Sequence, residues 1–438
     1  MISLPRVLIG QNHAITTLSV EPYETRSLGA SFGYAGHGNH YENRSNLSES
    51  AVCSVERIDD TAGFERLKPE WNDLLHESES DCLFLTWEWL FTWWKHLSGG
   101  RRLHILAVRC GAQLVGLAPL AIRPWQPGRL IPFKILEFLG TGSVGSDYLD
   151  VIIRRGNETL VKRALSGYLV DSTLMLELGQ LRNVITGAQQ TAENLANRDW
   201  QVQREVTDVC PFINLAELTW DEYVSTLGSS HRRNLRKRIR NLYDKFSVRL
   251  ETAVSEQERQ SKFAQFLELH NRRWSADGGS DALNSSKIVD FHAEFSRMAL
   301  ESGWLRLRIM YLDDQPATAI YGFRYGDTFY YYQAGHNPEF SAYSVGLVSL
   351  GLSIQQAIGE GAKEYDLLHG NEGYKALWTH KQRELCRIRL YPPNLPGFLY
   401  RRDMQLRESI KFLRDRLLRA NSDKHGNAKL TGQGAESV

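Results

Sequence analysis

The sequence lacks an excess of charge of either sign. Its 52 Lys and Arg residues are balanced by 51 Asp and Glu residues, which leaves a formal net charge of +1. A chain without a large net charge has no overall field that draws it to nucleic acid or to an anionic membrane. We therefore expect no DNA partner, and any basic binding surface has to be local.

Cysteine is scarce as well. The chain has five cysteines, an odd number, widely spaced and without a Cys-x-x-Cys pair: Cys53, Cys82, Cys110, Cys210 and Cys386. This pattern indicates neither a zinc site nor a disulfide framework. We expect no bound metal, and the lack of predicted disulfides favours a reducing cytoplasm.

Long apolar runs are also missing. No stretch approaches the roughly 20 consecutive apolar residues of a transmembrane helix. The first residues do not form the apolar run of a signal peptide. We expect a cytoplasmic protein without a transmembrane segment.

The remaining composition is that of a globular protein, with 42% hydrophobic and 24% charged residues. A length of 438 residues suits two domains better than one. Residues 1–50, rich in Gly, Ser, Asn and His, are predicted to be a flexible tail. The predicted domains are 51–216 and 217–397, and residues 398–438 are predicted to form a C-terminal helix and a disordered tail.

Two hairpin patterns, at residues 103–123 and 305–325, indicate an internal duplication. In both, an apolar strand is followed by a polar turn and by an apolar return strand. Helical patterns precede each hairpin, and a strand–helix–strand pattern follows it. The sequence therefore predicts an α/β (α+β) fold made of tandem duplicated modules.

The second of these strand–helix–strand patterns holds the best candidate site. An aromatic strand is followed by a turn, by an apolar helical run over residues 347–358 and by a strand over residues 362–368. Such a crossover makes the two strands parallel. The helix start offers free N–H groups from Tyr343 to Leu347, and Gly346 lets a ligand approach them closely. A phosphate or pyrophosphate fits such a helix start, although Ser and Gly also serve there as simple caps.

Four other features have two interpretations each. Trp87, in a helix with four tryptophans, either packs in a core or lines a pocket. The glycine-rich stretch 140–146 is either a phosphate-binding loop or a connection. Asp147 and Asp150 are either turn residues or substrate contacts. The helix at residues 231–242 has six Arg or Lys residues beside an apolar stripe, so it is either a solvated face or a patch for an anionic ligand or RNA.

Residues 365–378, Tyr-Asp-Leu-Leu-His-Gly-Asn-Glu-Gly-Tyr-Lys-Ala-Leu-Trp, are similar to a family pattern, (Y/F)D(F/L)LxGxxxYKxxW. Shorter matches lie at residues 84–89, 146–150 and 231–236. Through these motifs the chain resembles the CelD/BcsL-type acyltransferases of the GNAT superfamily, which are close to the Fem-type tandem-GNAT proteins. The resemblance covers residues 52–393, with Val345 at a position where the family often has proline.

The resemblance implies a mixed, mostly antiparallel sheet in each module, flanked by helices and splayed at its centre. Acyl-CoA, with acetyl-CoA as the expected form, would enter the splay as co-substrate and rest its pyrophosphate on the helix that starts near Ser344. The predicted acyl-CoA-binding residues are Gln333, Tyr343, Ser344, Val345, Gly346 and Leu347.

Acyl transfer to an amine needs a group that takes the amine proton, donors for the developing oxyanion and an acid for the thiolate. Because no Ser–His–Asp order or Cys–His pair stands out, we expect direct attack on the thioester. The predicted catalytic residues are Asp366, His369 and Tyr374, whose alternatives are a turn carboxylate, a loop histidine and a core tyrosine. The predicted substrate-binding residues are Trp87, Asp147, Tyr148, Arg232, Arg233 and Lys375.

Lys375 has two further possible roles, which are binding a CoA phosphate and pairing with Asp366. The predicted function is an acyl-CoA-dependent N- or O-acyltransferase, whose acceptor binds between the two halves. By family analogy this acceptor is a sugar, a polysaccharide precursor or another small amine or hydroxyl compound. One alternative is a Fem-like aminoacyl-tRNA-dependent transferase, in which residues 231–242 contact the tRNA. Another is a non-catalytic binding protein that keeps the duplicated fold.

Overall fold

The computed structural model describes residues 53–125, 133–142, 144–172, 174–275, 283, 285–407, 409, 410 and 414. These residues belong to one unit of the chain, Ala51–Val438. The tail predicted at residues 1–50 and the end of the chain after residue 414 lie outside the described residues. The predicted domain limits stay predictions.

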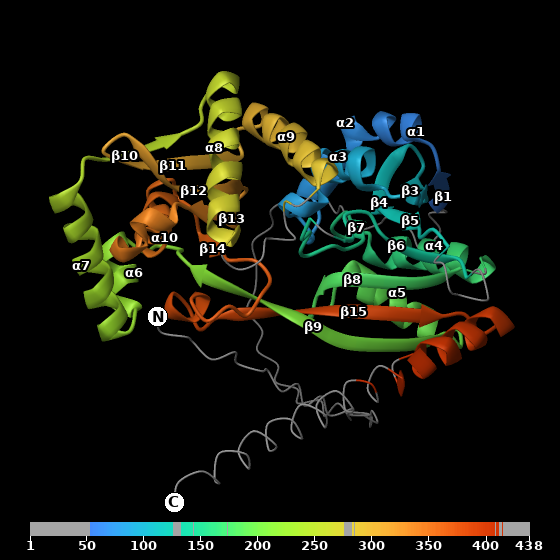
Figure 1. Cartoon of the computed structure of the whole chain (residues 1–438). Helices are drawn as coiled ribbons and strands as arrows, with labels where there is room; N and C mark the ends of the chain where they lie inside the picture. Colours follow the sequence, from blue (N-terminus) through green and yellow to red (C-terminus); the bar gives the residue numbers. More distant parts are fainter. Residues whose placement is uncertain are drawn as a thin grey trace, which may run out of the picture. The chain divides into compact units, whose positions relative to one another are not determined.

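The described strands form two sheets (Figure 1). The smaller sheet has the order β1-β3-β4-β7, with bounds β1 Cys53–Ile58, β3 Ile105–Cys110, β4 Gln113–Ala118 and β7 Ile152–Ile153. The larger sheet has the order β10-β11-β12-β13-β14-β9-β15-β8-β6-β5-β2. Its strands are β2 Arg102–Leu103, β5 Leu120–Ile122, β6 Ile135–Phe138, β8 Met175–Arg182, β9 Gln201–Asn214, β10 Val248–Thr252, β11 Leu305–Leu312, β12 Gln315–Tyr325, β13 Thr328–His336, β14 Glu364–Asp366 and β15 Gln382–Tyr391.

The two halves of the chain share a hairpin followed by a parallel pair of strands. The antiparallel hairpins β3–β4 and β11–β12 are the two hairpins that the sequence predicts. Each half then has one parallel pair, β6 with β8 and β13 with β14. A helix lies between the two strands of each pair along the chain, α4 (Glu158–Asp171) and α10 (Val345–Gly359). The predicted fold of tandem modules with mixed, mostly antiparallel sheets is therefore confirmed.

The two halves exchange their last strands. β9, the last strand of the N-terminal half, pairs with β14, and β15, the last strand of the C-terminal half, pairs with β8. β9 and β15 also pair with each other, from Gln201↔Tyr391 to Pro211↔Gln382. Figure 1 shows these two long strands side by side, reaching from one set of elements to the other. In each half, the second strand of the parallel pair therefore has a strand of the other half as its neighbour.

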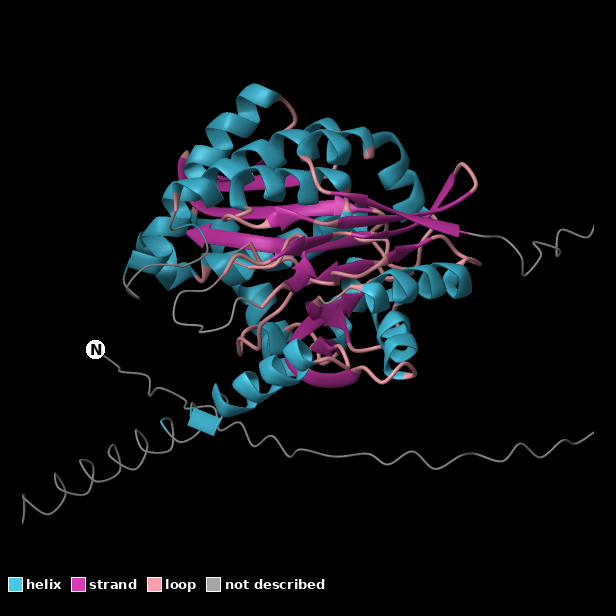
Figure 2. Ribbon diagram, turned by 90° about the vertical axis from the view of Figure 1, so that its right-hand side faces the viewer, coloured by secondary structure: helices cyan, strands magenta, loops and turns pink. Residues whose placement is uncertain are grey.

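Helices lie on either side of the strands (Figure 2). Their bounds are α1 Thr61–Arg66, α2 Lys68–His76, α3 Trp87–Leu97, α5 Gly187–Ala196, α6 Trp220–Thr226, α7 Ser229–Lys245, α8 Glu256–Ser275 and α9 Ser286–Glu301, besides α4 and α10. The helices α3 and α9, one from each half, pack against each other. Trp89 of α3 contacts Phe291 and Phe295 of α9 edge-to-face, so the largest apolar cluster runs through both halves.

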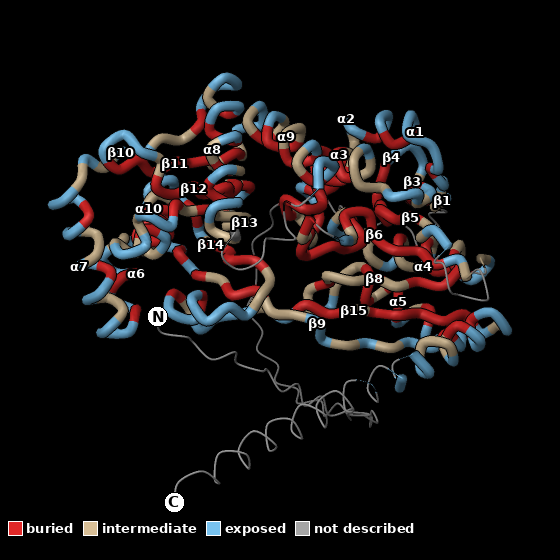
Figure 3. The backbone as a smooth tube through the Cα atoms, in the orientation of Figure 1, coloured by how far each residue is buried: buried red, intermediate tan, exposed pale blue. Residues whose placement is uncertain are grey.

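The basic helix α7 lies at the edge of this arrangement, and Figure 3 shows long exposed stretches along it. Leu235 and Leu242 are its buried residues, as the apolar stripe predicts. No helix among the described residues combines the length and the apolar character needed to cross a bilayer.

The prediction that the cysteines form no disulfide is wrong. Cys53 and Cys110 are disulfide-bonded, with their Cα atoms 4.3 Å apart. The antiparallel register of β1 and β3 places these two residues opposite each other, and spacing along the chain does not reveal such pairing. The expected cytoplasmic location loses this support and stays a prediction.

Candidate functional site

The site begins where the parallel strands β13 and β14 separate. They pair over three residues only, from Thr328↔Glu364 to Tyr330↔Asp366. β13 continues to His336, while β14 ends and the chain turns away at Leu368, which has a left-handed backbone with φ 58°. Side chains beyond this point line two adjoining pockets.

The first pocket lies at the start of α10 and has a volume of about 240 Å³. Its lining includes Gly346 and Leu347 on the helix and Gly335 and His336 on β13. Gly346 is exposed, and a Cβ placed there would meet no other atom within 4 Å. The lining is mostly apolar apart from the helix start, so a long, flexible and largely apolar group fits this space.

Local sequence explains the position of the helix start. Asn337 caps a short 3-10 helix, Pro338–Tyr343, by accepting a hydrogen bond from the N–H of Glu339. Ser344 then turns the chain with a left-handed φ of 55°, and α10 begins at the buried Val345. Within the described chain, the N–H groups of Val345, Gly346 and Leu347 have no acceptor. The positive end of the helix dipole therefore meets an open surface.

The second pocket has a volume of about 520 Å³ and shares Arg273, Tyr331, Ala334 and Tyr374 with the first. The two pockets thus form one continuous cleft, which we call the splay cleft. Its inner end is lined by His369, which directly follows the turn at Leu368. The His369 side chain is 40% exposed, so its ring is accessible from the cleft.

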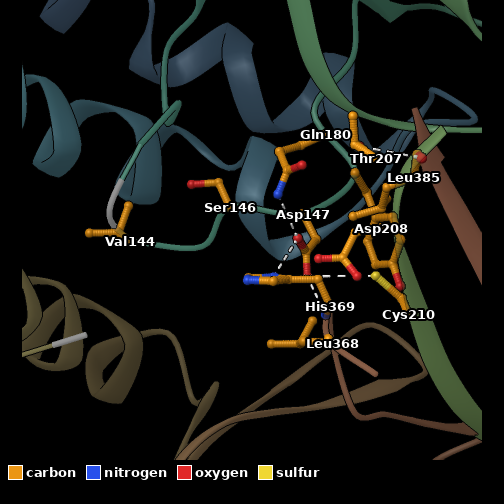
Figure 4. A network of polar contacts seen from close by, with 12 residues as sticks. Val144, Ser146, Asp147, Gln180, Thr207, Asp208, Cys210, Leu368, His369 and Leu385 are labelled. Carbon is orange, nitrogen blue, oxygen red and sulfur yellow. Dashed lines mark hydrogen bonds and ion pairs between the residues drawn. The ribbon is translucent and has the colours of Figure 1, made fainter. Parts of the chain in front are cut away.

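His369 is held by a buried carboxylate from the N-terminal half. Its Nδ1 lies 3.0 Å from Oδ2 of Asp147, and its backbone N–H donates to the same oxygen at 2.9 Å. Gln180 Nε2, at 3.2 Å, and the Cys210 thiol, at 3.7 Å, also donate to Asp147. Figure 4 shows these three residues converging on Asp147. The hydrogen bond and charge of Asp147 raise the pKa of His369 above its usual 6.5, although burial opposes this.

The ring of His369 also lies against a glycine. A Cβ at Gly145 would come within 2.9 Å of His369 Cε1, and φ there is 58°, so any other residue would be strained and displace the ring. With Nδ1 engaged by Asp147, Nε2 is left to exchange a proton with a molecule in the cleft. This is the geometry of a histidine general base oriented by a carboxylate.

Residues 229–376 match the family model described as Acetyltransferase (GNAT) domain. This GNAT segment contains α10, β13, β14 and His369, whereas Asp147 lies outside it. No curated protein matches the chain.

Solved structures resemble the chain over most of its length. A structure of FemX has 13% sequence identity and a TM-score of 0.55, and the match covers 79% of this chain and 99% of FemX. L-PGS from Bacillus licheniformis has 10% identity and a TM-score of 0.44, over 76% of this chain and 95% of that one. A tandem GNAT protein from the clavulanic acid pathway has 10% identity and a TM-score of 0.40, over 76% and 98%. At such identities the FemX likeness concerns the fold alone, and the other two carry no argument.

The other two predicted catalytic residues of the GNAT segment lie in different surroundings. Asp366 is completely buried behind the cleft wall and accepts hydrogen bonds from Tyr148 OH at 2.7 Å and from Arg383 at 3.3 Å. Burial raises the pKa of Asp366 to about 6. Tyr374 lines both pockets and is 36% exposed, and burial of its hydroxyl raises its pKa. Only Tyr374 and His369 therefore reach the cleft.

Lys375 does not pair with Asp366 as one of its predicted roles required. It donates to the carbonyls of Leu368 and His369 at 3.1 and 2.8 Å and pairs with Glu372 at 2.9 Å. Almost fully buried, it ties together the loop that carries His369. The partners of Lys375 could not be predicted from the sequence, because they depend on how the loop folds back over the lysine.

The remaining predicted residues fall into three groups. Gln333 lines the inner pocket, and Tyr343 and Ser344 flank the start of α10. Trp87 is buried in the N-terminal core, where its indole N–H donates to the carbonyl of Phe64. Tyr148 is buried with its hydroxyl on Asp366. Two arginines lie on α7, where Arg232 donates to the carbonyl of Ser225 and Arg233 lines a shallow pocket that also includes Leu347.

Sequence reasoning missed several cleft residues. Gln180, Arg273, Trp274 and Tyr331 line the inner pocket without having been singled out. Arg273 and Trp274 lie near the end of α8, where a charged residue next to an aromatic one is typical of an ordinary helix surface. Among the described residues, no group of three or more His, Cys, Asp or Glu side chains has the geometry to hold a metal ion.

Proposed function

We propose that this chain is an acyl-CoA-dependent N- or O-acyltransferase of the CelD/BcsL type, with acetyl-CoA as its donor. The observation that carries the proposal is the splay cleft, which connects the open start of α10 to a histidine bonded to a buried carboxylate. The match of the GNAT segment to an acetyltransferase model supports the same reaction class.

The residues present fit acyl-CoA. The free N–H groups of Val345, Gly346 and Leu347 suit a pyrophosphate, and Gly346 leaves room for it. The apolar pocket along β13 suits a pantetheine arm. Bound acyl-CoA would supply an activated thioester carbonyl.

The chain's own residues supply the proton transfers. Nε2 of His369 accepts the proton of the acceptor amine or hydroxyl, while Asp147 keeps the ring oriented and stabilises its charged form. Tyr374, where the two pockets meet, is the proposed proton donor to the thiolate. Asp366, buried behind the cleft wall, is assigned a positioning role through Tyr148 and Arg383.

The proposed acceptor is a sugar or a polysaccharide precursor. The inner pocket combines aromatic rings, Trp274, Tyr331 and Tyr332, with the polar side chains of Gln180 and Gln333. Such a mixture of flat apolar faces and hydrogen-bonding groups suits a pyranose ring. The acceptor class and a place in polysaccharide biosynthesis rest on family resemblance, with this lining as support.

Thermal unfolding with and without acetyl-CoA tests the donor. A ligand at 100 times its dissociation constant stabilises the folded state by about 2.7 kcal/mol, so we expect the melting temperature to rise by roughly 2 °C or more. The His369→Ala variant should show the same rise, because it keeps the phosphate contacts. An unchanged melting temperature at millimolar acetyl-CoA would contradict the proposal.

The second candidate, an aminoacyl-tRNA-dependent transferase, is supported by the exposed basic face of α7. Arg233, Arg236, Lys237 and Arg240 are all exposed on this helix. Replacing Arg232, Arg233 and Arg236 by Gln would abolish tRNA binding in a gel-shift assay if this candidate were correct. If tRNA does not bind to the wild type, or if it still binds after these changes, acyl-CoA is left as the donor.

A further inference from the structure

The splay cleft contains an arginine that forms no ion pair with the described residues, although the Glu372 carboxylate lines the same pocket. Arg273, near the end of α8, lines both pockets of the splay cleft. Its Nη1 donates to the carbonyl of Ala334 at 3.3 Å, and its guanidinium lies 4.8 Å from the centre of the Trp274 ring. In the described part of the chain, no carboxylate lies within ion-pair distance of it. Lys375, the other cation of the inner pocket, is already paired with Glu372.

Neighbours of Arg273 carry hydrogen-bond donors that have no acceptor among the described residues. The indole N–H of Trp274 is buried and has no hydrogen-bond partner among the described residues. The hydroxyls of Tyr331 and Tyr374, which line the same junction, have none among the described residues either. A buried donor left without an acceptor destabilises a protein. The guanidinium of Arg273 and the buried indole N–H of Trp274 therefore form a pair of donors that a ligand with acceptor oxygens would complete, and the two more accessible hydroxyls can add to it.

The geometry points to an anionic acceptor, one that carries a carboxylate or a phosphate held by Arg273 and Trp274. This inference rests on the proposed function, because it assigns the inner pocket to the acceptor. Trp274 lines the inner pocket next to His369 and is not part of the pocket at the start of α10, so the anion belongs to the acceptor side. A planar guanidinium binds both carboxylate and phosphate through paired hydrogen bonds.

The test uses inorganic phosphate and acetate as probes on the full chain. Both are titrated while the indole N–H resonance of Trp274 is followed by NMR, with the Trp274→Phe variant assigning that signal among the 11 tryptophans. We expect a saturable shift with at least one anion. The same titration with CoA present keeps the start of α10 occupied, so that the shift reports the inner pocket.

Arg273→Gln should weaken this binding about 10-fold or more, as expected for loss of a charge-assisted hydrogen bond. The control is Arg272→Gln, because Arg272 is half-exposed, pairs with Glu268 and does not line the cleft. The tighter of the two anions identifies the acceptor's group, and equal binding means that charge alone is recognised.

Two results would overturn the inference. One is the absence of a saturable Trp274 shift with either anion, and the other is equal binding by wild type and Arg273→Gln. The readout does not involve acetyl-CoA turnover, so its failure is separate from a failure of the donor to raise the melting temperature.

Discussion

At the scale of single residues, the central feature is a pair that is far apart in the sequence. His369 and Asp147 are separated by 222 positions, yet they are in direct contact, and Gln180 and Cys210 donate hydrogen bonds to the same carboxylate. A buried carboxylate of this kind fixes the tautomer of the ring and increases its basicity. The histidine belongs to one half of the chain and the carboxylate to the other, so both halves contribute to the proposed chemistry.

The first prediction concerns the pH dependence of this pair. The base form of His369 is neutral, and its pKa is raised above 6.5 by Asp147. We expect kcat/KM to rise with pH through that raised pKa and then to level off. Asp147→Asn removes the cause of the increase, so the rising limb should move to lower pH while the plateau falls about 10²- to 10⁴-fold.

Asp208→Asn is the control for this experiment. Asp208 raises the pKa of His369 through its charge alone and makes no hydrogen bond to it. In Asp208→Asn the rising limb of kcat/KM should therefore shift to lower pH by less than in Asp147→Asn, and the plateau should keep its height. A limb in the same place in wild type and Asp147→Asn would show that His369 is not the titrating base.

The residue types of this site could be predicted, but their partners could not. The motif around residues 365–378 identifies His369, Tyr374 and Lys375 as candidates, and the structure brings all three to one loop. The partner of His369 depends on the packing of two halves, which no local pattern encodes. The sequence predicts Asp147 as a turn residue or a substrate contact, and its contact with the histidine could not be predicted.

At the scale of elements, the helix α10 decides whether the proposed donor can bind. Its first turn offers free N–H groups, and Gly346 keeps the surface above them open. A side chain with a negative charge at this position would occupy the space and interact favourably with the helix dipole. Such a substitution at position 346 should therefore preserve or increase stability while it weakens binding of the donor.

The second prediction is that Gly346→Asp leaves the melting temperature unchanged or higher but weakens acetyl-CoA binding at least 10-fold. Isothermal titration calorimetry measures the binding, and thermal unfolding measures the stability. Gln355→Glu adds the same charge at an exposed position farther along α10 and should leave binding unchanged. Equal affinity of Gly346→Asp and wild type would place the phosphates elsewhere.

The boundaries of helices and strands depend on single residues that interrupt a periodic pattern. The periodic pattern over residues 62–76 predicts one helix, but the chain forms α1 and α2, with Pro69 in the first turn of α2. The apolar pattern over residues 148–153 predicts one strand, but only β7 forms there, because Tyr148 adopts a left-handed φ of 61°. The basic helix α7 forms where its pattern predicts it, because its charged residues and its apolar stripe both have helical spacing.

At the scale of the whole molecule, the exchange of β9 and β15 makes the two halves interdependent. Repetition of the hairpins predicts two modules, and both are present. The exchange could not be predicted, because an apolar strand pattern shows that a strand exists and not which edge it joins. The shared apolar cluster across α3 and α9 adds to the coupling.

The third prediction is that the unit Ala51–Val438 unfolds in one cooperative transition and that neither of its halves folds alone. Fragments 51–216 and 217–397, expressed separately, should each show poor chemical-shift dispersion and bind a hydrophobic dye. Mixed during refolding, they should recover dispersed NMR spectra, because β8 and β14 then find their partners. A well-folded fragment 51–216 on its own would contradict this interdependence.

The late position of β15 has a consequence for how the cell makes this protein. The edge of β8 leaves the ribosome roughly 200 residues before its partner strand is synthesised, which takes about 10–40 s at usual elongation rates. During that time the nascent chain presents an unpaired strand edge that other chains can join. Synthesis of this protein should therefore depend on chaperones that shield nascent chains, and its yield should improve when translation is accompanied by more of them.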